Sequence, residues 1–132
     1  MGTKYLLDSN TVIYLLSNSF PESTSEKIQS IIDADDYFLS VITRMEVLGF
    51  NGNQDEMELA TEFMSDSIII GLEEAIILRT ISLRKQQKIK LPDAIIAATA
   101  LVHRLTLVTR NLDDFKNISG LDLINPDELT AA

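Results

Sequence analysis

The chain of 132 residues is 45% hydrophobic and contains no cysteine, so one domain over residues 1–132 is expected and thiol chemistry and thiolate metal sites are excluded. No signal-peptide core and no apolar run near the roughly 20 residues of a membrane helix is present, which predicts a cytoplasmic protein without a membrane anchor. The net charge of −9 argues against a broad basic face that coats nucleic acid, but it is compatible with a nuclease whose bound cations neutralise phosphate.

Short apolar runs alternate with longer segments of helical period, a pattern that indicates an α/β fold. Strands are predicted over residues 5–7, 37–41, 67–70 and 106–108, with a weaker one over 121–124. Helices are predicted over residues 11–16, 25–34, 44–50, 56–64, 73–88 and 92–104, with a break at 21–23 and Gly52 ending the third. Pro92 is expected at the first position of the last of these helices.

Acidic residues are predicted to gather at one edge of the sheet. Parallel strands joined by right-handed crossovers place their carboxyl ends together, and ligands of such folds bind along that edge. Asp8 follows the first strand directly, and Glu46 is expected in the first turn of the helix that leaves the second strand. Asp93 begins the helix that leads to the fourth strand, and Asp114 follows that strand.

Carboxylates gathered in one cleft repel one another, so their convergence implies a bound cation. Ligation by oxygen alone, without His or Cys, suits Mg²⁺ or Mn²⁺ rather than zinc. Such ions orient and deprotonate a water and stabilise the charge on phosphate, so the pattern favours phosphodiester hydrolysis.

Each acid also has a purely structural interpretation. Thr43 and Glu46 have the spacing of a capping box, and Asp8 and Asp93 are suited to the start of a helix. Asp113 and Asp114 are also compatible with an exposed turn. These interpretations do not explain why all of these positions fall at one edge.

The basic residues offer candidate contacts with an RNA backbone. Lys88 and Lys90 belong to the basic cluster of residues 84–90 just before Asp93, and Arg110 lies beside the predicted site. The alternative is that these cations are only solvated, and that the cluster simply lies at the carboxyl terminus of a helix. His103, near the end of its helix, is interpreted as a structural residue.

Four segments together resemble a PIN domain, specifically the VapC type of toxin ribonuclease. They are Leu6-Leu7-Asp8-Ser9-Asn10, the helical Glu46, residues 91–100 (LPDAIIAATA) and residues 107–115 (LVTRNLDDF). The resemblance implies a three-layer α/β/α sandwich with a central, mostly parallel sheet of four to five strands. It also implies a metal-dependent endoribonuclease that is the toxin of a type II toxin–antitoxin system, with a VapB-type antitoxin as its partner and a homodimer as its assembly.

The resemblance also assigns the site residue by residue. Asp8, Glu46 and Asp93 match the first three acids of the family site. Asp114 is the preferred fourth position, Asn111 is a second candidate, and Asp113 is the spare. Ser9, Asn10 and Thr109 are expected to support the site, the two hydroxyls by positioning water or metal ligands.

Two other classes of function remain open at this point. A receiver-like signalling domain would share the size, acidity and Mg²⁺ site, but it needs an Asp after the third strand, where this chain has Gly71. A catalytically inert PIN-like module that binds RNA or a partner would keep the fold without the chemistry. Action on structured DNA is disfavoured, because the chain has no room for additional DNA-gripping elements.

Overall fold

The computed structural model describes residues 2–130, so Met1, Ala131 and Ala132, which the expected domain includes, lie outside the described residues. Within that range, five strands form one sheet in the order β3-β2-β1-β4-β5, and every neighbouring pair is parallel. The strands are β1 (Tyr5–Leu7), β2 (Tyr37–Ser40), β3 (Ile69–Ile70), β4 (Thr106–Val108) and β5 (Leu123–Ile124). The predicted α/β class and the presence of five strands are confirmed, although three strands are shorter than the predicted ranges 37–41, 67–70 and 121–124.

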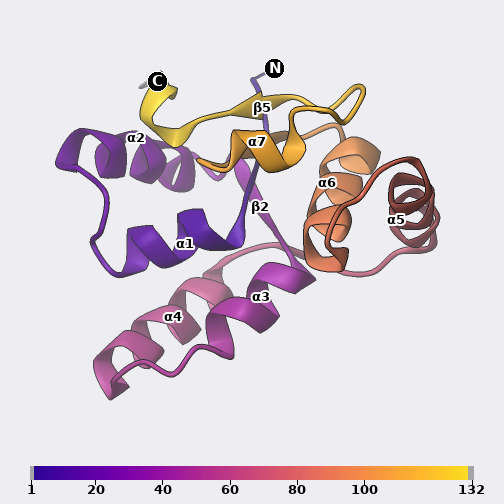
Figure 1. Cartoon of the computed structure of the whole chain (residues 1–132). Helices are drawn as coiled ribbons and strands as arrows, with labels where there is room; N and C mark the ends of the chain where they lie inside the picture. Colours follow the sequence, from indigo (N-terminus) through magenta and orange to yellow (C-terminus); the bar gives the residue numbers. More distant parts are fainter. Residues whose placement is uncertain (1, 131–132) are drawn as a thin grey trace.

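Helices flank the sheet and connect its strands (Figure 1). They are α1 (Ser9–Leu16), α2 (Glu22–Asp33), α3 (Val41–Leu48), α4 (Gln54–Asp66), α5 (Glu74–Gln86), α6 (Leu91–His103) and the short α7 (Leu112–Phe115). A 3-10 helix, η1 (Pro126–Glu128), follows β5. None of the helices in residues 2–130 is long and apolar enough to cross a membrane.

The strands bury alternate residues on the two faces of the sheet, which gives the three layers. Leu6 and Leu107 belong to the core cluster that includes residues of α5, α6 and α7. Their neighbours Leu7 and Val108 belong to the second cluster, which includes residues of α1, α2, α3 and α4. Side chains of successive strand residues point to opposite faces, so each strand contributes to both cores. The expected α/β/α sandwich is confirmed.

The ends of several helices differ from their predicted positions. Helix α3 begins at Val41 because the Ser40 hydroxyl accepts a hydrogen bond from the Ile42 amide, and it ends at Leu48 with Gly49 as its C-cap, before the predicted stop at Gly52. Glu46 is therefore in the second turn of α3, not in the first. Helix α2 begins at Glu22, so that residues 22 and 23 are helical, and Pro92 is the second residue of α6, not the first.

The carboxyl ends of the two central strands lie side by side. The register pairs Leu7 with Val108, and the Asp8 amide donates to the Val108 carbonyl at 3.2 Å. Asp8 and Thr109, the residues that follow these strands, are therefore neighbours although they are 101 positions apart. This pair lies at the carboxyl edge of the sheet, where the sequence predicted the site.

Candidate active site

Asp8 is the most buried acid of the site, with an exposed fraction of 6%. It caps α1, because its Oδ1 accepts a 2.8 Å hydrogen bond from the Thr11 amide. Its Oδ2 accepts a 2.6 Å bond from the Thr109 hydroxyl. The expected role at a helix start is therefore real, but the cap uses only one carboxylate oxygen and leaves the second turned to Thr109.

Glu46 does not form the capping box that its spacing suggested. The residue that caps α3 is Ser40, so Thr43 lies inside the helix and is fully buried. The Glu46 Oε1 instead accepts a 2.6 Å hydrogen bond from the Ser9 hydroxyl. Ser9 Oγ also lies 3.1 Å from Thr43 Oγ1, so a small hydroxyl cluster holds the Glu46 side chain toward the start of α1.

Asp93 lies in the first turn of α6, where the charges of the other acids affect its pKa. Burial raises the pKa of its carboxyl, and the negative charges of Asp114, Glu46 and, more weakly, Asp8 raise it further, whereas Lys90 lowers it. A charge shifts a neighbouring pKa only when the two groups are close. The charges of the other three predicted acids therefore reach Asp93.

The Asp8 carboxyl responds in the same direction. Burial raises its pKa above the ordinary value, hydrogen bonds from Thr109 and Thr11 oppose that rise, and the charge of Glu46 adds to it. Burial is the main cause of both raised pKa values, and neighbouring carboxylates add to it, so the ionised forms of Asp8 and Asp93 are disfavoured in the metal-free protein. A divalent cation would offset this cost, and the oxygen donors of the acids suit such a metal chemically.

The three candidates for the fourth acid of the site differ in their surroundings. Asp114, in α7, acts on Asp93 through its charge. Asp113 is exposed and pairs with Lys116 at 3.2 Å. The Asn111 amide donates a 3.0 Å bond to the Thr109 hydroxyl oxygen. Asp113 and Asp114, for which an exposed turn was the alternative interpretation, lie in the first turn of a short helix.

Three of the four acids line two different cavities, and Glu46 lines neither of these. A cavity of about 320 Å³ is lined by Asp8, Asn10, Thr11, Tyr14, Ser19, Thr109, Arg110 and Asn111; we call it the Asp8 cleft. A second, of about 510 Å³, has Asp93, Asp113 and Asp114 beside Arg84, Lys88 and Lys90 in its lining. In residues 2–130 no three His, Cys, Asp or Glu side chains are placed so that they could hold one metal ion. The acids are thus coupled through their charges but stand apart in space.

The basic candidates have different surroundings. Lys88 and Lys90 line the same cavity as Asp93. Arg110 lines the Asp8 cleft, but one of its nitrogens is bonded to Asp127 at 3.0 Å. His103 contacts Glu73, in agreement with its interpretation as a structural residue.

Two contributions were missed by the sequence reasoning. The buried Thr11 supplies the amide that binds Asp8, and its hydroxyl bonds the Val108 carbonyl at 3.1 Å. The three-residue spacing of Asp8 and Thr11, typical of a helix cap, was the available signal. Asp127, the partner of Arg110, has no local sequence signal, because it lies 17 residues further along the chain.

Comparison with known proteins gives one consistent answer. The family model described as the PIN domain matches residues 5–121. The curated protein "Ribonuclease VapC1" of Haemophilus influenzae (strain R2866) is 30% identical over 126 residues, which cover 89% of this chain and 93% of that protein. A solved toxin–antitoxin complex from Klebsiella pneumoniae is 34% identical, with a TM-score of 0.75 over 93% of this chain and 98% of its own. DNA-bound VapBC from Salmonella typhimurium, 24% identical, shares the fold with a TM-score of 0.77 over 95% of this chain and 99% of its own.

Proposed function

The chain belongs to the PIN-domain family and, within it, to the VapC ribonucleases, and from this premise we propose that it cleaves RNA internally as the toxin of a toxin–antitoxin pair. The matched region covers most of residues 1–132, which supports a single nuclease domain. Because the chain belongs to this family, the receiver-like signalling domain that the sequence left open is set aside. An enzyme that acts on cellular RNA would work in the cytoplasm, and we propose that location.

The observation that carries the proposal is that hydroxyls of other elements bind two of the predicted acids, since Thr109 donates to Asp8 and Ser9 donates to Glu46. The pKa of Asp93 agrees with this grouping, because burial raises it and the charges of the other three acids raise it further. The negative charges of widely separated parts of the chain thus act on Asp93 and disfavour its ionised form in the metal-free protein. Such an arrangement is expected where a cation has to be held.

Asp8, Glu46, Asp93 and Asp114 are the proposed metal ligands, and because they stand apart in the metal-free protein, binding would have to draw their side chains together. PIN-domain VapC nucleases depend on a divalent metal, and the oxygen donors of this chain favour Mg²⁺ or Mn²⁺. When bound, such an ion activates a water for attack on phosphorus and neutralises the phosphodiester.

The chain's own hydroxyls would orient those acids. Thr109 donates to Asp8 and Ser9 donates to Glu46, each at 2.6 Å, so one oxygen of each carboxylate is fixed in direction. Outer hydrogen bonds of this kind orient metal ligands and raise metal affinity. Asn10 and Asn111 line the same cleft as Asp8, where their side chains are available to water or phosphate.

Lys88 and Lys90 are proposed to contact the RNA backbone. Both line the cavity that contains Asp93 and Asp114, so a phosphate bound there would meet positive charge next to the acids. Arg110 is a third candidate on the wall of the Asp8 cleft.

The partner is proposed to be a VapB-type antitoxin, and the assembly a homodimer that binds it. The support is the likeness to the Klebsiella toxin–antitoxin complex, which extends over 93% of this chain.

A direct test uses the purified protein freed of its antitoxin. With Mg²⁺ or Mn²⁺ it should cut a pool of cellular RNA at internal positions that sequencing of the new ends reveals, and chelation of the metal should stop the reaction. Expression in cells should be toxic, and Asp93→Asn should relieve the toxicity. RNA that stays intact with both metals, together with equal toxicity of the Asp93→Asn variant, would refute the proposal.

A further inference from the structure

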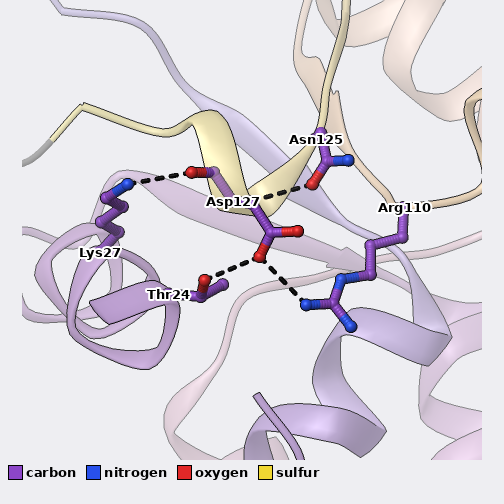
Figure 2. A network of polar contacts seen from close by, with 5 residues as sticks. All are labelled: Thr24, Lys27, Arg110, Asn125 and Asp127. Carbon is purple, nitrogen blue, oxygen red and sulfur yellow. Dashed lines mark hydrogen bonds and ion pairs between the residues drawn. The ribbon is translucent and has the colours of Figure 1, made fainter. Parts of the chain in front are cut away.

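Asp127, in η1, bonds to two different parts of the chain (Figure 2). Its Oδ1 accepts hydrogen bonds from the Thr24 hydroxyl at 2.7 Å and from Arg110 Nη2 at 3.0 Å. Its backbone carbonyl accepts from Lys27 Nζ at 2.9 Å, and its amide donates to Asn125 Oδ1 at 2.9 Å. One residue near the carboxyl end thus ties α2 to the segment that follows β4.

Arg110 is held from a second side by an aromatic ring. Its Cζ lies 4.5 Å from the centroid of the Phe20 ring, within the range of a cation–π interaction. Phe20 is 6% exposed and packs edge-on against Tyr14, with 5.6 Å between the ring centroids. Tyr14 and Arg110 both line the Asp8 cleft, so the fixed guanidinium forms part of its wall.

Arg110 lies between two residues that are bonded to each other. The Thr109 hydroxyl donates to Asp8 Oδ2 at 2.6 Å, and the Asn111 amide donates to the Thr109 hydroxyl oxygen at 3.0 Å. Displacement of Arg110 would move the backbone on both sides of it. The direction of the Thr109 hydroxyl, and with it the Asp8 carboxylate, depends on this three-residue segment.

We propose that Asp127 is a positioning residue of the active site, which through Arg110 holds residues 109–111 so that the Thr109 hydroxyl stays bonded to Asp8. The inference rests on the proposed function to the extent that Asp8 belongs to the nuclease site. Asp127 is well suited to this role, because the hydrogen bond from Arg110 lowers the pKa of its carboxyl and keeps it ionised. Exposed ion pairs add little to global stability, so the effect of this one is local.

Amide hydrogen exchange of the metal-free protein tests the link without any measurement of RNA cleavage. Asp127→Asn should speed exchange of the Asn111 amide about tenfold or more, because that amide loses its ordered acceptor. Arg110→Gln removes the other partner of the same contact and should also speed exchange of the Asn111 amide. In the double variant this amide should exchange no faster than in the single variant with the larger effect. Asp36→Asn is a matched control, since it breaks a similarly exposed ion pair with Lys4 and should leave Asn111 unchanged.

Kinetics then connect the positioning role to function. Asp127→Asn should lower kcat about tenfold with little change in KM, and Asp127→Glu should recover part of the loss. An Asn111 exchange rate that is unchanged in both Asp127→Asn and Arg110→Gln would overturn the inference, as would equal acceleration by Asp36→Asn. If the wild-type protein cut no RNA, the proposed function would fail, while the exchange experiment would still decide whether Asp127 holds this segment.

Discussion

Ser9 and Glu46 are joined by a 2.6 Å hydrogen bond, in which the hydroxyl at the start of α1 donates to the carboxylate in α3. The two residues are 37 positions apart, so the bond exists only in the folded chain. It fixes the direction of an acid that would otherwise be free to swing on a flexible side chain. A hydroxyl that follows Asp8 directly thus orders the second acid of the proposed site.

Ser9→Ala should therefore weaken the nuclease more than the fold. Loss of a hydrogen bond to a metal-binding carboxylate costs roughly 10–100-fold in metal affinity or activity, and that is the loss expected in single-turnover RNA cleavage. Ser82→Ala, in α5, removes a half-buried hydroxyl that accepts a hydrogen bond from Gln86, and this variant should cleave normally. Normal cleavage by Ser9→Ala would show that Glu46 needs no such support.

Asp8→Asn should stabilise the metal-free protein at neutral pH. Because the folded state raises the pKa of Asp8 above 3.8, the protonated form contributes stability that is present below pH 3.8 and lost as the pH rises through the folded pKa. The neutral amide avoids that loss. Thermal melting in a chelator should show a gain in Tm of roughly 2–8 °C. The gain should shrink as the pH falls toward 3.8. A lower Tm for the variant at neutral pH would contradict this account.

Metal affinity should continue to rise at pH values above those at which an ordinary carboxyl loses its proton. Burial and the neighbouring acids raise the pKa of Asp93 above 3.8, so protons compete with the metal up to that raised value. Calorimetric titration of Mn²⁺ at a series of pH values should show the rise, and Asp93→Asn should flatten it. A pH dependence of the affinity that is the same in the wild type and in Asp93→Asn would argue against this coupling.

Asp114 and Asp113 provide a matched pair for the fourth position. Asp114→Asn should reduce RNA cleavage by at least about tenfold, because its charge acts on Asp93. Asp113→Asn should leave cleavage unchanged, since it breaks only an exposed pair with Lys116. Initial rates at saturating metal distinguish the two variants, and a loss confined to Asp113→Asn would reverse their assignment.

The sequence was most informative where a local pattern determines the structure. The apolar run of β1 and the Asp that ends it predicted both a strand and the acidic edge, because parallel strands end together. The start of α3 was misplaced because the Ser40 hydroxyl caps a helix that begins within the predicted strand. Helix α7, with four residues, is too short to show a period.

Contacts between distant segments were not predictable from such patterns. Arg110 was interpreted as an RNA contact or a solvated surface cation, and nothing in the sequence indicated that it is bound between Phe20 and Asp127, which lie in other segments of the chain. The separation of the acids into two cavities also depends on packing distances that sequence spacing does not encode.

The central claim is that Asp8, Glu46, Asp93 and Asp114 act together on a divalent cation. Titration of Mn²⁺ followed by electron paramagnetic resonance tests it most directly, because the bound and free ions give separate signals. We expect Asp8→Asn, Glu46→Gln and Asp93→Asn each to weaken binding at least about tenfold, and Asp113→Asn to bind as the wild type does. Wild-type affinity in the Asp93→Asn variant would contradict the claim.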